Sequence, residues 1–129
     1  GQNTYEEIDL IEKGKNYGWN ECEGFHSYRS DGDCTLAGAQ APVFEYDHMV
    51  GQSITGGYVY HGFSAPSLSG KLLFADFVQS KVFSLDISSG TFQETLLGRA
   101  PENVSAFGED ESGEVYIVGY GGTIFRIQD

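Results

Sequence analysis

Two stretches of the sequence match each other: Ser69-Gly70-Lys71-Leu72-Leu73-Phe74-Ala75-Asp76-Phe77 and, at an offset of 43, Ser112-Gly113-Glu114-Val115-Tyr116-Ile117-Val118-Gly119-Tyr120. Each stretch is a Ser-Gly turn followed by an apolar strand. The segments after them also match, Ser80–Asp86 with Gly122–Gln128, at an offset of 42. A repeat of ~40–50 residues with about four strands is typical of a β-propeller blade. Two similar hairpins in a β-sandwich would give the same likeness, and this alternative stays open.

Turn signals divide the rest of the chain into short segments of β character. Helical periodicity is nearly absent, apart from one weak turn near Asn3 to Glu7. The chain is therefore expected to be all-β. We expect strands at Glu7–Ile11, Pro42–Tyr46, Gly57–His61, Lys71–Phe77, Lys81–Asp86, Phe92–Leu97, Asn103–Phe107, Glu114–Tyr120 and Thr123–Gln128.

The second copy of the repeat is one strand shorter than the first. The first copy continues into a strand at Phe92–Leu97, whereas nothing comparable follows Thr123–Gln128. An unpaired edge strand is an aggregation liability, and propellers commonly complete the last blade with an outer strand from the N-terminus of the whole chain. The sequence thus predicts two to three blades of an incomplete ring, completed by the remainder of the propeller in the same or another chain. The expected division is one partial domain, 1–129, with a blade edge and cysteine loop at 1–50, a blade at 51–98 and a strand-deficient last blade at 99–129.

The charge balance excludes some partners. Lys and Arg total 7 against 19 Asp and Glu, so the formal net charge is -12. Phosphate binding needs a basic surface, so neither a nucleic acid nor an anionic membrane is an expected partner. No stretch approaches the ~20 apolar residues of a membrane span. An acidic surface suits cations such as calcium, although it also serves solubility alone.

The two cysteines flank a polar, turn-rich loop. Closing the loop between Cys22 and Cys34 with a disulfide would contribute about 3 kcal/mol, and we expect this bond. The alternative is two free thiols in a reducing compartment. A disulfide points to a secreted location, either extracellular or periplasmic.

Several segments resemble the glucose/sorbosone dehydrogenase family. The stretch from Gly1 to Trp19 resembles its hallmark, in which G-x-x-x-x-x-E-(I/V)-(D/N) leads to K-G-x-N-Y-G-W. Pro42–His48, Ser53–Tyr60 and Leu73–Phe77 resemble further parts of the same family. The Thr-Gly-Gly-Tyr-Val-Tyr run and the two cysteines after the tryptophan resemble the hedgehog-interacting-protein-like branch. The resemblance covers essentially the whole chain and implies the C-terminal two to three blades of a six-bladed β-propeller.

The family resemblance also implies a calcium ion. By position, the carboxylate ligand falls on Glu7 and a backbone carbonyl ligand on Tyr17, with the carbonyls of Gly1 and Gln2 near the same site. Calcium takes six to eight hard oxygens, which carboxylates and carbonyls supply. The alternative is that Glu7 faces solvent on a strand and Tyr17 packs in the core.

Family members oxidise sugars with pyrroloquinoline quinone, using a histidine base that lies upstream of this segment. His26, His48 and His61 do not match that histidine, so we expect them to be structural or surface residues and expect no catalytic residue in this chain.

The basic residues that anchor the quinone should fall at the turns Asp76–Ser80 and Asn103–Ser105. Neither turn contains Lys or Arg, although Lys81 and Arg99 are nearby. A trianionic quinone would lack charge-assisted hydrogen bonds there.

Two functions therefore remain open. The chain is part of a calcium-containing, quinone-dependent aldose dehydrogenase, or it is part of a non-catalytic secreted propeller that binds a sugar or an extracellular protein. Asn103-Val104-Ser105 also fits the N-glycosylation pattern, which makes Asn103 a weak acceptor candidate.

Overall fold

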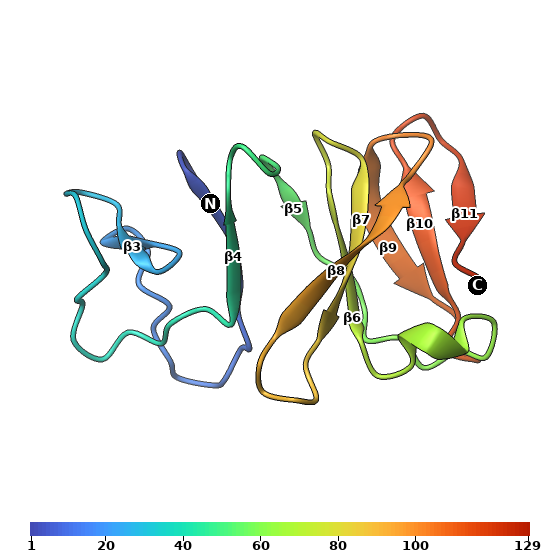
Figure 1. Ribbon diagram of the computed structural model, residues 1–129, viewed down its shortest axis with the longest axis horizontal. Helices are drawn as coiled ribbons and strands as arrows, with labels where there is room; N and C mark the ends of the chain where they lie inside the picture. The colour runs from blue at the N-terminus through green and yellow to red at the C-terminus, as the bar shows by residue number, and fades with distance from the viewer. The chain divides into compact units, whose positions relative to one another are not determined.

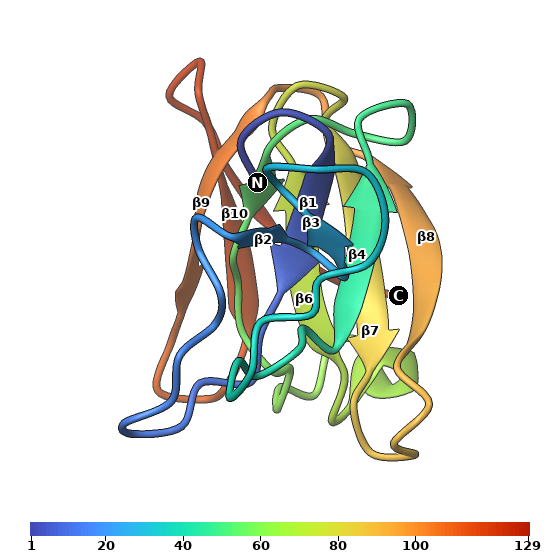
Figure 2. The same cartoon turned by 90° about the vertical axis from the view of Figure 1, so that its left-hand side faces the viewer.

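The computed structural model describes all residues 1–129 and divides the chain into two compact units, 1–52 and 53–129 (Figure 1). In the first unit, β1 (Tyr5–Ile8) and β4 (Phe44–Asp47) form an antiparallel pair in which Glu7 lies opposite Glu45. The short hairpin of β2 (Cys22–Glu23) and β3 (His26–Ser27) packs against β1 (Figure 2). The structure contains no helix long and apolar enough to cross a bilayer.

The second unit begins with a four-stranded antiparallel sheet in the order β5-β6-β7-β8. Its strands are β5 (Ile54–Thr55), β6 (Leu72–Asp76), β7 (Lys81–Asp86) and β8 (Gln93–Arg99). One 3-10 turn, η1 (Pro66–Leu68), is the only helical element. This sheet is the complete blade that the first copy of the repeat predicts.

A three-stranded antiparallel sheet follows, in the order β11-β10-β9. Its strands are β9 (Val104–Glu109), β10 (Val115–Gly119) and β11 (Ile124–Arg126). By the repeat, β10 corresponds to β6 and β11 to β7, and no strand corresponds to β8. The all-β partial propeller is confirmed, and its last sheet is one strand short.

The core of the second unit joins these two sheets. One cluster of buried residues contains Tyr60, Ala65, Leu68, Leu73 and Val115; another contains Ala75, Val82, Val104 and Ile117. Each cluster takes side chains from both sheets. At the inner strands the Thr55 hydroxyl donates a hydrogen bond to the Val104 carbonyl at 2.9 Å. Burial of this apolar surface, at roughly 25 cal/mol per Å², holds the sheets together.

Two strand predictions differ most from the structure, one in its bounds and the other in forming no regular strand. The expected strand at Glu7–Ile11 lies at Tyr5–Ile8, and the weak helical candidate near Asn3 to Glu7 forms no helix. The strand ends early because the Tyr17 hydroxyl accepts a hydrogen bond from the Glu12 N–H and donates one to the Leu10 carbonyl, and these bonds hold the segment as a loop.

The segment predicted as a strand at Gly57–His61 lies beside β6 without forming a regular strand. It makes one bridge, Val59 to Leu72, and two flanking hydrogen bonds. At Gly57 a side-chain Cβ would lie 2.0 Å from the Leu73 carbonyl oxygen, so this close approach requires glycine. The residues that do form the inner strand are Ile54 and Thr55.

Candidate functional site

A hollow of about 300 Å³ in the first unit is lined by Gly1, Gln2, Glu7, Trp19 and Glu23. Glu7 comes from β1 and Glu23 from β2, so the two strands bring carboxylates that are 16 residues apart in sequence to one place. Three of the four residues expected to hold calcium therefore meet here: Glu7, Gly1 and Gln2.

Glu23 fastens the start of the chain to the hollow. Its Oε1 atom accepts hydrogen bonds from the N–H groups of Gln2 and Asn3, each at 2.5 Å, and of Thr4 at 3.1 Å. Burial raises the pKa of Glu23, but these backbone donors outweigh it and leave that pKa below its ordinary value. Glu23 consequently remains an anion at neutral pH.

The pKa of Glu7 is shifted in the opposite direction, above its ordinary value. Its Oε2 atom accepts a hydrogen bond from the Gly24 N–H at 2.6 Å. Burial nevertheless raises the pKa of Glu7, and the negative charges of Asp9 and Glu23 raise it further. Burial also raises the pKa of Asp9, whose Oδ1 atom is buried without a hydrogen-bond partner. A cation near these groups would stabilise their charged forms.

The side chains at this hollow do not form a complete metal-binding group by themselves. No three Asp, Glu, His or Cys side chains in the structure converge as a metal-binding group. A cation at the hollow would therefore need backbone carbonyl ligands in addition to Glu7, as hard cations such as calcium readily accept.

Tyr17, the fourth expected ligand, has its side chain in a different place. It lines a smaller hollow of about 90 Å³ together with both cysteines, and its hydroxyl is engaged by Leu10 and Glu12. Its expected contribution, through the backbone carbonyl, stays a prediction. Sequence reasoning missed Glu23 and Asp9. Asp9 lies just beyond the end of β1, so the alternation of strand residues gives no signal for it.

The cysteine loop is held by a disulfide and by one carboxylate. Cys22 and Cys34 form the expected bond, with Cα atoms 5.4 Å apart. The two oxygens of Glu45 contact the His26 Nε2 atom at 2.9 Å and accept a hydrogen bond from the Phe25 N–H at 2.7 Å. The loop thus has a defined conformation on β4.

The histidines have structural surroundings. The His26 ring also stacks on Tyr5, with centroids 3.9 Å apart. His48 lies 3.1 Å from the buried Glu6 through its Nε2 atom. His61 is exposed and follows Tyr60 of the core.

The two turns expected to face a quinone are bonded within their own chain. The buried Asp76 accepts hydrogen bonds from the N–H groups of Gln79, at 2.7 Å, and Ser53, at 2.8 Å. The Asn103 side-chain amide donates to the Phe77 carbonyl at 2.6 Å, and the Arg99 guanidinium donates to the Gln79 carbonyl. These contacts order the turns. The Arg99 guanidinium is engaged within the chain. The atom of Asn103 that a glycan would modify is the one engaged by Phe77.

The family pattern described as Glucose / Sorbosone dehydrogenase matches residues 1–126. The chain belongs to this family. Two plant relatives support the expected branch. "HIPL1 protein" of Arabidopsis thaliana is 32% identical over 161 aligned residues, which take in 98% of this chain and 23% of that protein. "HIPL2 protein" of the same plant is 31% identical over 116 aligned residues, covering 75% of this chain and 16% of that protein.

Solved structures show the same fold. This family member superposes over its whole length on 39% of a glucose dehydrogenase crystal structure, with a TM-score of 0.76 and 20% identity. It also superposes, over 91% of its length, on 35% of the soluble aldose sugar dehydrogenase of Escherichia coli in the apo form, with a TM-score of 0.65 and 22% identity. The chain thus spans about a quarter or less of the curated relatives, and under half of these structures.

Proposed function

We propose that this chain is the calcium-binding part of a secreted, extracellular or periplasmic propeller that oxidises aldoses with a quinone when complete. The observation that carries the proposal is the hollow where Glu7 and Glu23 meet the start of the chain. Family membership supports the aldose chemistry of the whole protein, and the disulfide supports an oxidising compartment.

The residues at the hollow fit a calcium ion. Glu7 would supply a carboxylate oxygen, and Gly1 and Gln2, which line the same hollow, would supply carbonyl oxygens. Glu23 would contribute negative charge while its Oε1 atom holds the backbone of Gln2 and Asn3. A bound calcium would neutralise this charge and tie β1 to the start of the chain. It would also offset the burial and repulsion that raise the pKa of Glu7.

A calcium titration followed by fluorescence tests this proposal, because Trp19 is the only tryptophan and lines the hollow. We expect a saturable change in the native chain, and an apparent affinity lower by about tenfold or more in Glu7→Gln, which loses the charged ligand. Because the pKa of Glu7 is raised, protons should displace calcium at a higher pH than they would at an ordinary glutamate.

Glu12→Gln is the matched control, since Glu12 is an exposed carboxylate of the same unit outside the hollow. It should titrate like the native chain. An unchanged titration in Glu7→Gln, or an equal loss in Glu12→Gln, would show that the response comes from the acidic surface as a whole.

The residues do not fit the quinone. The turns after β6 and before β9 contain no basic residue, and Arg99 is bonded to a backbone carbonyl of its own chain. The quinone and the catalytic base are therefore assigned to other parts of the complete protein. That protein should oxidise aldoses in a dye-linked assay when supplied with calcium and the quinone. No activity across a broad sugar panel would exclude the enzyme.

A second function is favoured by the exposed aromatic residues in and just before the cysteine loop. Trp19 is 57% exposed and Phe25 is 42% exposed, and the Trp19 and Tyr28 rings lie 4.7 Å apart. Exposed aromatic side chains are common anchors for sugars and proteins. If the propeller is a non-catalytic binder, a glycan array or a pull-down should capture a ligand that Trp19→Ala loses. Retention of the ligand by this variant would exclude the loop as the binding surface.

A further inference from the structure

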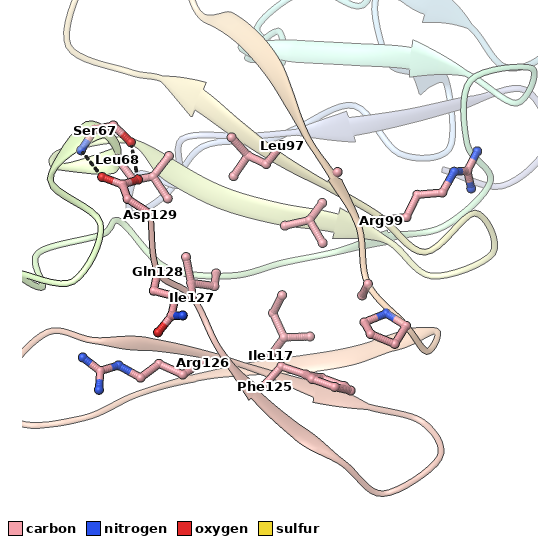
Figure 3. A pocket seen from close by; sticks show the side chains of 14 residues that line it. Ser67, Leu68, Leu97, Arg99, Ile117, Phe125, Arg126, Ile127, Gln128 and Asp129 are labelled. Carbon is pink, nitrogen blue, oxygen red and sulfur yellow. Dashed lines mark hydrogen bonds between the residues drawn. The ribbon is translucent and has the colours of Figure 1, made fainter.

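One cavity of the second unit is accounted for by the expected completion of the ring. It has a volume of about 400 Å³ and lies between the end of β8 and β11. In Figure 3 the side chain of Leu97 faces the cavity from one side, and those of Ile117 and Phe125 face it from the other. These apolar side chains border the strand-deficient sheet. The hollow of the first unit is different, because carboxylates of this chain line it.

The Cys22–Cys34 disulfide is next in sequence to a residue that lines this hollow. Cys22 begins β2, and Glu23 is the following residue. The Glu23 Oε1 atom accepts hydrogen bonds from the N–H groups of Gln2 and Asn3, each at 2.5 Å. A bond that fixes Cys22 therefore also fixes the backbone at the start of the chain, where two of the proposed calcium ligands lie.

β2 and the turn after it also hold the Glu7 carboxylate. The N–H group of Gly24, one residue beyond Glu23, donates a hydrogen bond to the Glu7 Oε2 atom at 2.6 Å. Gly24 has a φ of +63°, and a Cβ there would lie 2.0 Å from the Glu45 Oε2 atom, so this close approach requires glycine. The hairpin thus orients the side chain that is proposed to bind the ion.

The disulfide contacts a second wall of the hollow. Trp19, which lines the hollow, follows Gly18, and the Gly18 carbonyl accepts hydrogen bonds from the N–H groups of Glu21 at 2.9 Å and Cys22 at 3.0 Å. A Cβ at Gly18 would lie 2.9 Å from the Cys22 Sγ atom, so the sulfur packs directly on this backbone. The disulfide therefore supports two residues of the hollow, Trp19 and Glu23.

We propose that the Cys22–Cys34 disulfide is a redox control on the calcium site of the hollow. With the bond intact, β2 holds Glu7 and the start of the chain in place for the ion. Reduction frees β2 from the loop and weakens calcium binding. The linkage is reciprocal, so bound calcium opposes reduction by the same factor. This inference rests on the calcium site proposed above.

The reduction itself needs a dithiol. One thiolate of the reductant attacks a cysteine sulfur, and its second thiol resolves the mixed disulfide, leaving two cysteine thiols and the oxidised reductant. Cys22 is only 5% exposed, whereas Cys34 is half-buried and borders two hollows of the loop. Attack is therefore expected at the Cys34 sulfur, with Cys22 as the leaving group.

Reduction kinetics test the linkage. Dithiothreitol is the reductant, and the freed cysteines are alkylated and counted by mass spectrometry. We expect saturating calcium to slow the reduction by about tenfold or more, and sodium chloride of equal ionic strength to leave the rate unchanged. The Trp19 titration, repeated on the reduced chain, should show an apparent calcium affinity that is lower by a similar factor.

Glu23→Asp separates this linkage from general stabilisation of the folded unit. The variant keeps the charge and the disulfide, but its shorter side chain does not reach the N–H groups of Gln2 and Asn3. At calcium concentrations that saturate its own Trp19 response, calcium should slow the reduction by about twofold or less. Glu12→Gln, which changes an exposed carboxylate outside the hollow, should retain the native slowing.

Equal reduction rates with and without calcium in the native chain would overturn the proposal. Full protection of Glu23→Asp would also overturn it, because the effect would then come from stabilisation of the folded unit. An unchanged calcium affinity in the reduced chain would remove the redox control and leave the calcium site in place. A flat Trp19 titration of the oxidised chain would instead contradict the calcium site, and the redox control would fall with it.

Discussion

Glu114→Ala is expected to lower the thermal midpoint of the 53–129 unit by about 10 °C or more. Glu114 is a buried carboxylate at the start of β10 that accepts four hydrogen bonds: from the Tyr60 hydroxyl at 2.7 Å, the Phe63 N–H at 2.9 Å, the Ser64 N–H at 3.0 Å and the Ser64 hydroxyl at 2.9 Å. Arg126 of β11 lies 3.6 Å away. Alanine would leave these donors without their acceptor and detach the 60–65 segment from the second sheet.

The same carboxylate should make the unit sensitive to acid. Burial raises the pKa of Glu114, but hydrogen bonds from Tyr60, Phe63 and Ser64 outweigh it and hold this pKa at about 2, below the ordinary 4.5. The pKa is depressed in the folded state, so its contribution to stability is complete above pH 4.5 and is lost as the pH falls toward 2.

Denaturation midpoints from far-UV circular dichroism, measured across that pH range, check this expectation. Glu114→Gln should be less stable at neutral pH and should lack the part of the acid dependence that the native carboxylate causes. Other carboxylates also titrate in this range, so the difference between the two proteins is the quantity to compare. Parallel pH curves for both would show that Glu114 does not control acid unfolding.

Replacing Cys22 and Cys34 together with serine is expected to destabilise the 1–52 unit by about 3 kcal/mol, the value for closing a loop of this length. The loss is large for this unit because its buried apolar side chains are few, namely Cys22, Pro42 and Tyr46. A unit of 52 residues with so small a core has little stability in reserve. In the double variant, the 1–52 unit should be partly or wholly unfolded at room temperature.

Trp19 reports on that unit alone, so its fluorescence should change in the double variant as its contact with the Tyr28 ring is lost. Amide protection in β6 and β7 should persist, because the second unit has its own core. The native chain under reducing conditions should behave like the double variant. Native-like fluorescence in both samples would mean that hydrogen bonds, and not the disulfide, hold the loop.

The repeat was sufficient to predict most of the second unit. Because side chains alternate along a strand and turn residues mark its ends, local patterns predicted β6, β7, β10 and the absence of a counterpart to β8. Bounds were less accurate where a distant group decided them. The end of β1 depends on the Tyr17 hydroxyl nine residues beyond Ile8, and no local pattern reveals that contact.

The residues of the candidate sites were likewise only partly predictable from the sequence. The hallmark stretch pointed to Glu7, Gly1 and Gln2, but Glu23 and Asp9 emerged only when β1, β2 and the start of the chain were seen together. Glu114 had no sequence signal beyond replacing the Lys71 of the first copy.

By itself, the sequence determined the all-β class and the repeated blade, and it predicted the disulfide, because each depends on local spacing or on simple pairing. Only the tertiary structure decided which carboxylates are buried, which donors they receive and where the unpaired edge meets a cavity. Those properties arise from residues brought together across tens of positions, and the energy of a buried charge depends on every group packed around it.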